Sequence, residues 1–249
     1  MASGSESDLR LAYSPLTTRL RRYGRLDAAQ ATPLERMPFV EKTYARGETI
    51  IRRGDPVENV LVMTSGWAAR SRVVRSGNRQ IIHILLAGDL MTADAFVLKR
   101  MDHQIEALST AVVRFVKPGD LRRALESSPG LSAALWWAAA QEDSLIREHV
   151  VRVGRRPALE RVSHFLLELH RRLLMVGQAT EGAMILPITQ EEIGDALGLS
   201  NVHVNKMLRD LERRGLLRRR KTVLQIEDRA AMARFCDFDE VHFHLDDAA

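Results

Sequence analysis

The chain contains two regions with different patterns of apolar and polar residues. From 43 to about 115, apolar and polar residues alternate in short runs that are rich in strand-forming residues. Glycine-containing turns such as Gly54-Asp55 separate these runs. Closely spaced turns between such runs predict an antiparallel β-roll or β-sandwich. The strands expected are 60–63, 68–74 and 80–86, and two short helices are expected before them at 15–23 and 28–37.

A long helix is predicted after this region. Helix-forming residues fill the stretch from Gly130 to Val153, roughly 24 residues or ~36 Å of helix. Such a helix between two small domains usually pairs with a second copy, so we predict a dimer helix; the alternative is a single helix packed on its own roll. We expect Gly154 to end it and Pro157 to begin the next helix, which makes 154–157 a hinge. The residues near heptad spacing, whose register the sequence leaves open, are Leu131, Leu135, Ala139, Glu142, Ile146, His149 and Val153.

The strongest local pattern lies between Ile188 and Leu217 and predicts a helix-turn-helix. Thr189 and Glu192 have the spacing of a capping box for a first helix, and Ser200 can cap a second. Gly198 supplies the turn, where a side chain would resist the backbone conformation. An αα-hairpin with a solvated outer face is the alternative. The buried faces are expected to contain Ile193, Ala196, Leu197, Val204, Met207, Leu208 and Leu211.

The outer face of the second helix is predicted to enter the major groove of DNA. Asparagine can pair with adenine, lysine can reach guanine or a phosphate, and valine can pack on a thymine methyl group. The stretch 216–226 predicts a β-hairpin wing with a basic tip along the phosphates, for which a solvated charge run is the usual alternative. The candidate DNA-binding residues are Thr189, Gln190, Ser200, Asn201, Val202, His203, Asn205, Lys206, Arg209, Arg218, Arg219, Arg220 and Lys221.

Positive charge is concentrated in this C-terminal segment. The 249 residues include 37 Lys and Arg against 32 Asp and Glu, which gives a net charge of +5. Between 188 and 226 there are eight basic and five acidic residues, and an acidic stretch follows at 237–247. A focused basic segment favours an anionic partner such as duplex DNA.

The remaining composition argues against several classes of protein. Cys236 is the only cysteine, so we expect a passive thiol, no intrachain disulfide, and no thiolate-ligated iron–sulfur or zinc site. The first dozen residues lack a signal-peptide pattern and no apolar run reaches the ~20 residues of a membrane span, so we expect a cytoplasmic protein without membrane contact. No Ser/His/Asp set or phosphate-binding loop is present, and His83 has no second histidine two residues away. A cupin-like metal enzyme is therefore disfavoured, and we do not expect an enzyme.

From 16 to 226, the arrangement resembles the Crp/Fnr superfamily of dimeric transcription regulators. The segment Gly47-Glu48-Thr-Ile-Ile-Arg-Arg-Gly54-Asp55 is similar to the first turn of the family's roll, and Gly66 and the Gly88-Asp89 pair are similar to later glycines. The resemblance implies an α+β fold with a cyclic-nucleotide-binding-like antiparallel β-roll, a long dimerisation helix and a winged helix-turn-helix. It also implies a homodimer on an imperfect DNA palindrome, a signal in the roll that biases the DNA-binding heads, and RNA polymerase as a further partner. The expected domains are a β-roll sensor domain at 1–128, the dimerisation helix at 129–154, and a winged helix-turn-helix domain with an acidic tail at 155–249.

The sensor pocket departs from the family pattern. Cyclic-nucleotide binders of the family have a Gly-Glu pair after Gly-Asp and a later Arg beside Ser or Thr, whereas here Ala93 stands near the Glu position and Arg100 has other neighbours. Cyclic AMP is therefore not expected, nor is an iron–sulfur cluster, since the N-terminal cysteines are absent; the cofactor is left open. Haem or metal ligation by histidines 83, 103 or 149 is disfavoured, and a roll that serves only as a dimerisation scaffold is the alternative to a sensor. The candidate pocket residues are His83, Asp94, Arg100 and His103.

The recognition helix departs from the pattern as well, because the family often has Glu and Arg where Val202 and Lys206 stand. Loss of the Glu removes an acceptor for cytosine, and lysine lacks the forked geometry of arginine, so we do not assume the family's usual half-site. We predict that Lys206→Ala lowers operator affinity and relaxes one base preference. Equal weakening on specific and random DNA would instead make Lys206 a phosphate contact.

Overall fold

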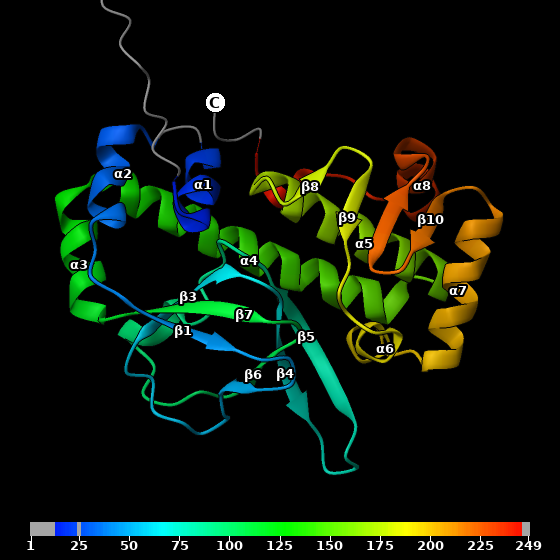
Figure 1. Ribbon diagram of the computed structural model, residues 1–249, viewed down its shortest axis with the longest axis horizontal. Coiled ribbons are helices and arrows are strands. Elements are labelled where there is room, and N and C mark those ends of the chain that lie inside the picture. The colour runs from blue at the N-terminus through cyan, green and yellow to red at the C-terminus, as the bar shows by residue number, and fades with distance from the viewer. Residues whose placement is uncertain (1–12, 24–25, 246–249) are drawn as a thin grey trace, which may run out of the picture.

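The computed structural model describes residues 13–23 and 26–245, and its N-terminal half is a β-roll (Figure 1). One antiparallel sheet has the strand order β1-β7-β3 and the other β2-β6-β4-β5. This confirms the antiparallel roll predicted from the alternating pattern. The strands are β1 (Val40–Tyr44), β2 (Thr49–Ile51), β3 (Val60–Ser65), β4 (Ala68–Val73), β5 (Arg79–Leu85), β6 (Gln104–Ala107) and β7 (Ala111–Val116). The short helical elements are α1 (Pro15–Leu20), η1 (Arg21–Tyr23) and α2 (Ala28–Glu35) before the roll and η2 (Ala93–Phe96) within it.

Apolar side chains fill the interior of the roll. Leu61, Met63, Met91, Met101 and Ile105 are each at most 3% exposed and belong to one contiguous cluster. Methionine suits this role because its unbranched, flexible side chain fills irregular gaps. The interior is therefore a packed core, separate from the larger core that runs through the helices.

The long helix α4 (Pro129–Arg155) follows α3 (Pro118–Ser127) and contacts both β5 of the roll and α5 of the C-terminal unit (Figure 1). Ser128 caps it by accepting a hydrogen bond from the Leu131 amide at 3.3 Å. The helix continues through Gly154, which we expected to end it. It stops at Arg155 because Pro157 disfavours a helical conformation of the preceding residue, Arg156, which is extended (φ −72°, ψ 138°).

The C-terminal unit contains a four-stranded sheet in the order β10-β11-β9-β8. The sequence pattern predicted only the two strands of the wing. The sheet is larger because β9 pairs antiparallel with β11, aligning Met184 with Leu224, and β8 then pairs with β9. The elements are α5 (Ala158–Met175), β8 (Ala179–Thr180), β9 (Ala183–Ile185), α6 (Gln190–Leu197), α7 (Asn201–Arg213), β10 (Leu217–Arg220), β11 (Val223–Ile226), α8 (Arg229–Cys236) and η3 (Val241–Phe243).

The segment after the wing, which we expected to be an acidic tail, packs against α4 as far as it is described. Phe243 is fully buried, and its carbonyl oxygen accepts a hydrogen bond from Gln141 Nε2 at 2.7 Å. Trp137 Nε1 donates to the His244 carbonyl at 2.9 Å. Cys236 is also buried, and burial raises the pKa of its thiol to about 12, which fits the passive thiol that we expected.

Candidate nucleic-acid interface

Helices α6 and α7 form the predicted helix-turn-helix. Thr189 Oγ1 accepts from the Glu192 amide at 3.1 Å and Glu192 Oε2 accepts from the Thr189 amide at 2.6 Å, so the capping box is complete. Gly198 has φ 64°, which favours glycine. A Cβ atom on Gly194 would lie 2.3 Å from the Leu199 carbonyl oxygen, so only glycine lets the turn pass this close to α6. Local chemistry therefore accounts for the motif.

The two faces of α7 differ sharply in exposure. Its inner side chains Val204, Met207, Leu208 and Leu211 are buried, as predicted. On the opposite face Val202 is 82% exposed. The outer side chains, with Gln190 of α6, surround an open hollow of about 830 Å³. The exposed members of the predicted DNA-binding set on this helix are Asn201, Val202, His203, Lys206 and Arg209.

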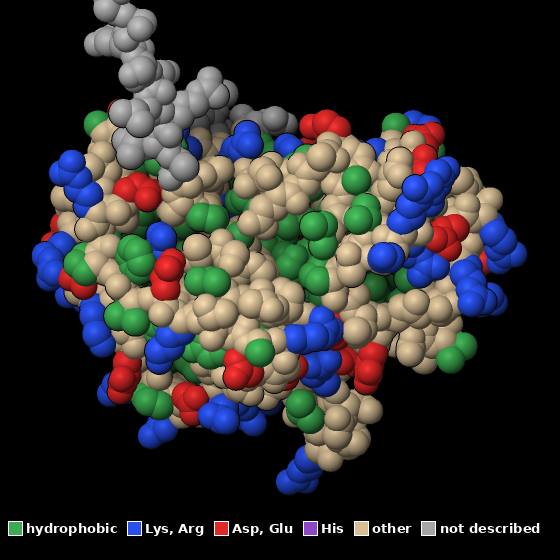
Figure 2. All heavy atoms as spheres, in the orientation of Figure 1, with side chains coloured by type: hydrophobic (Ala, Val, Ile, Leu, Met, Phe, Trp, Pro, Cys, Tyr) green, Lys and Arg blue, Asp and Glu red, His purple; other side chains and the backbone are tan. Residues whose placement is uncertain are grey.

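The wing places two free cations beside this face. Arg219 of β10 donates to both carboxylate oxygens of Glu212 at 3.0 and 2.8 Å, which lowers the pKa of Glu212, and Arg218 pairs with Glu227 at 3.1 Å. Arg220 and Lys221 are exposed and form no ion pair with any residue that the structure describes. Figure 2 shows Lys and Arg side chains gathered at the edge of the molecule over α7 and the wing. Of the four basic residues that we expected along the phosphates, these two carry uncompensated charge.

The roll holds α6 directly. Arg46, in the turn after β1, donates to both carboxylate oxygens of Glu192 at 2.7 Å. Arg79 of β5 contacts Asp195 at 2.7 Å, and Gln80 Nε2 donates to the Ala196 carbonyl at 3.1 Å. The first helix of the helix-turn-helix is therefore attached to the roll as well as to its own unit.

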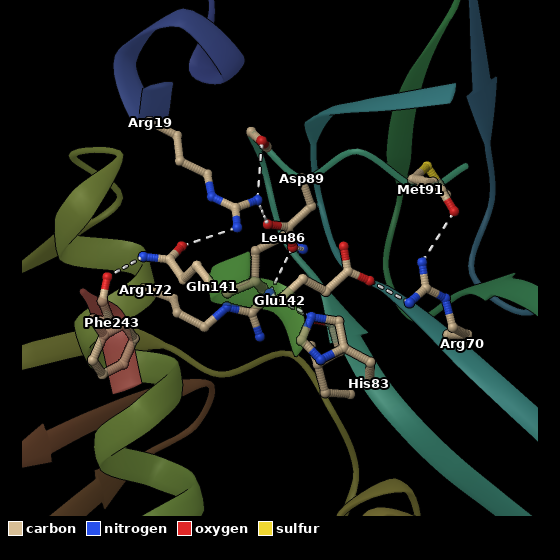
Figure 3. Close-up of polar contacts among 12 residues, drawn as sticks. Arg19, Arg70, His83, Leu86, Asp89, Met91, Gln141, Glu142, Arg172 and Phe243 are labelled. Atoms are coloured by element: carbon tan, nitrogen blue, oxygen red, sulfur yellow. Dashed lines mark hydrogen bonds and ion pairs between the residues drawn. The ribbon is translucent and has the colours of Figure 1, made fainter. Parts of the chain in front are cut away.

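A buried charge cluster joins the roll, α1, α4 and α5 (Figure 3). Asp89, after β5, lies 2.6 Å from Arg19 of α1 and 2.6 Å from Arg172 of α5. Arg19 also donates to Gln141 of α4 at 3.0 Å. His83 Nε2 lies 3.2 Å from Arg172, and burial together with that guanidinium keeps the pKa of His83 well below its ordinary value. The sequence offered no signal for this cluster, because Arg19 and Arg172 belong to helices far from the roll strands along the chain.

The three candidate ligand-pocket residues whose side chains are described contact different partners in the structure. His83 contacts Arg172, Arg100 is exposed and donates to the Gly54 carbonyl at 2.8 Å, and His103 lies 2.6 Å from Asp102. The side chain of Asp94 lies outside the described residues. Among the described residues no group of three or more His, Cys, Asp or Glu could hold a metal ion. Between the two sheets lies a packed cluster of apolar side chains that includes Leu61, Met91 and Ile105.

Helix α4 turns one face to its own chain and another outward. Of the seven residues that we predicted near heptad spacing, only Ala139 is exposed. Leu131 is buried, and Glu142 forms an ion pair with Arg70 of β4. The others are partly buried: Leu135, Ile146, His149 and Val153. The outward face instead contains exposed residues at alternating spacings of four and three, a pattern that fits a coiled-coil seam. These outward residues, the α4 stripe, are Trp136, Ala140, Asp143, Arg147, Val150 and Gly154.

An apolar cavity adjoins the N-terminal half of the α4 stripe. Its volume is about 330 Å³, and its walls come from α1, α3, α4 and the end of η2 with the residue after it, and include Phe96, Val97, Leu125 and Trp136. Val97 and Trp136 are each 78% exposed at its mouth. Exposed apolar side chains thus continue from the stripe onto the roll, a pattern that the sequence-based heptad assignment missed.

No described helix combines the length and apolar character needed to cross a lipid bilayer.

Comparison with known proteins matches both halves of the chain to described domains. Residues 160–235 match the Crp-like helix-turn-helix domain and residues 41–128 match the cyclic nucleotide-binding domain. The nitrogen fixation regulation protein FixK of Azorhizobium caulinodans is 31% identical over 77% of this chain and 77% of its own length. The transcriptional activator protein FnrL of Cereibacter sphaeroides is 24% identical over 78% of each chain. These relatives are regulators, not enzymes.

A solved structure supports the same fold. FixK2 from Bradyrhizobium japonicum superposes with a TM-score of 0.71 at 29% identity, covering 80% of this chain and 97% of that chain. The arrangement of roll, long helix and helix-turn-helix is therefore shared along nearly the whole of FixK2.

Proposed function

This chain belongs to the Crp/Fnr family of transcription regulators, and from that membership we propose that it binds operator DNA as a homodimer, with α7 of each copy in a major groove. One observation carries the proposal: α7 buries its apolar face and leaves Asn201, Val202, Lys206 and Arg209 exposed around an open hollow. A helix that enters a groove needs this exposed face, because direct readout requires side chains that reach base edges.

The contacts divide into readout and positioning. Lys206 has the length and charge to reach guanine O6 or N7, and Val202 can pack on a thymine methyl group. Arg220 and Lys221 at the wing tip supply phosphate contacts, which add affinity and salt dependence but no base preference. The half-site differs from one read by Glu and Arg, since valine and lysine occupy those two positions.

Pairing of two copies along the α4 stripe supports the dimer. Trp136 and Val150 are 78% and 62% exposed, large apolar side chains that a second copy would cover. Ala140 and Gly154 allow close approach of the two helices. A twofold axis along this stripe relates the two heads and accounts for a palindromic operator.

A second candidate concerns the roll, which we propose acts as a scaffold without a nucleotide in its interior. The packed cluster of Met63, Met91 and Met101 supports this view, and so does the buried pair of Asp89 and Arg172, which resists displacement of the head. Cyclic AMP and cyclic GMP should then leave operator affinity unchanged. A change in affinity on addition of either nucleotide would restore a sensing role for the roll.

Two further parts of the proposal follow from a relative and from the location of the target. Because FnrL is named a transcriptional activator, we propose that this chain contacts RNA polymerase at the promoter. We also propose that it acts in the cytoplasm, since the DNA that it would bind lies there. Footprinting with and without polymerase tests the first: a joint footprint supports it, and independent footprints contradict it.

Selection of bound DNA from a random pool tests the main proposal. The expected product is an inverted repeat with half-site centres about one helical turn, ~34 Å, apart. A single unrepeated site would contradict the dimer, and a pool without any enriched sequence would contradict sequence-specific binding. Lys206→Ala should then relax selection at one position.

A further inference from the structure

A hydrogen bond links the two helices of the helix-turn-helix on the face that remains open. Asn205 Nδ2 of α7 donates to Gln190 Oε1 of α6 at 2.8 Å. Both side chains line the same hollow as Val202 and Lys206, and both are partly buried, whereas Val202 and Lys206 are exposed. Asn205 is therefore the outward amide of α7 whose orientation is set by a residue of another helix.

The bond leaves Asn205 with the groups that adenine recognition requires. An asparagine amide has two N–H donors and one carbonyl acceptor, and Gln190 takes one donor. One N–H and the carbonyl oxygen remain for a partner. In the major groove adenine presents the N7 acceptor beside the N6 donor, and asparagine pairs with both at once.

We propose that Asn205 reads an adenine in each half-site and that Gln190 is its positioning residue. This assignment rests on the proposed function, the binding of α7 in a major groove. Gln190 restricts the rotation of the Asn205 amide before DNA arrives, so less side-chain freedom is lost on binding. Asn201, exposed one turn earlier on α7, has no such amide partner among the described residues.

The assignment can be tested by measuring affinity for the selected operator and for operators in which one base pair at a time is changed. Asn205→Ala should abolish the preference for adenine at one position per half-site, an effect of about 5- to 150-fold for a bidentate pair. Gln190→Ala should reduce the same preference several-fold and leave the other positions unchanged. The double variant should discriminate no worse than Asn205→Ala alone, because Gln190 acts through Asn205.

Asn201→Ala is the matched control, since it removes an amide from the same helix. The loss of operator binding free energy caused by Asn201→Ala should add to the loss caused by Gln190→Ala. Thermal unfolding of each variant separates folding from recognition: a shift in Tm without loss of the adenine preference would make the bond a purely structural link and overturn the proposal.

Two other results would also overturn it. Equal weakening of Gln190→Ala on all sequences would assign Gln190 to the phosphates, and unchanged preferences in Asn205→Ala would remove Asn205 from readout. In both cases the wild-type chain still selects an operator, so the proposed function stands. A wild-type chain that selects no DNA would overturn the proposed function itself.

Discussion

Arg172, on the first helix of the C-terminal unit, places its Nη2 atom 2.6 Å from Oδ2 of Asp89, in the roll. The two side chains are 6% and 7% exposed, and the same Arg172 nitrogen also donates to the Ile84 carbonyl at 2.8 Å. Arg19 holds the other oxygen of Asp89. One carboxylate therefore contacts two buried guanidinium groups and joins the DNA-binding unit to the roll.

Asp89→Asn is expected to lower the free energy of unfolding by about 3–5 kcal/mol, because Arg19 would remain buried without an anion and Arg172 would keep only Glu168, which lies 3.9 Å away. Chemical denaturation of the purified chain measures the loss. Glu41→Gln is the control, since its pair with Arg114 is solvent-exposed and such pairs contribute about 0–1 kcal/mol. Equal losses in the two variants would contradict the central role of Asp89.

Arg220→Ala and Lys221→Ala are each expected to weaken binding to operator and random DNA alike. Each substitution removes one free cation from the wing, so the slope of log affinity against log salt should fall by about 1. Arg219→Ala is the internal comparison, because Glu212 already balances its charge, and its slope should change less. A larger slope change for Arg219 would mean that this ion pair opens on DNA.

Val150→Asp is expected to shift the chain from dimer towards monomer, since it replaces an apolar side chain of the α4 stripe, which a second copy would cover, with a charged one. A tenfold or larger weakening, about 1.4 kcal/mol or more, should appear in sedimentation equilibrium. Val241→Asp is the matched control: this valine, 75% exposed on η3, lies outside the stripe. A dimer of undiminished affinity in Val150→Asp would place the interface elsewhere.

Acid should destabilise the fold in the pH range in which His149 has different protonation states in the folded and unfolded chains. Burial first, and then the Arg152 guanidinium, lower the pKa of His149 from 6.5 to about 4. Because the folded-state pKa lies below the unfolded value, the unfolded chain binds the proton first as the pH falls. The stability is complete above pH 6.5 and is lost as the pH falls towards 4, at up to about 1.4 kcal/mol per pH unit for one histidine.

His149→Gln removes this contribution, so its unfolding free energy should depend less steeply on pH between 6.5 and 4. Denaturation of both proteins at several pH values in that range provides the comparison. Identical pH dependence would show that His149 does not titrate differently in the folded and unfolded chains.

The helix-turn-helix could be predicted residue by residue because its determinants are local. The capping box of Thr189 and Glu192 spans three residues, and Gly194 and Gly198 meet needs that arise within the turn itself. The roll could be predicted as a class, since alternation and turns also act over short distances. Its filled interior could not, because no local pattern tells whether Met63, Met91 and Met101 leave a cavity between them.

The amino-acid sequence by itself determined the class of the roll, the recognition helix and the basic wing, all of which depend on interactions within a few residues. Only the tertiary structure decided which face of α4 is left outward, that Glu212 balances Arg219, that Gln190 orients Asn205, and that Asp89 unites Arg19 with Arg172. Arg19 and Asp89 are 70 positions apart along the chain, and Asp89 and Arg172 are 83 positions apart. The free energy of such contacts depends on how whole elements pack, and packing is a property of the assembled chain rather than of any segment.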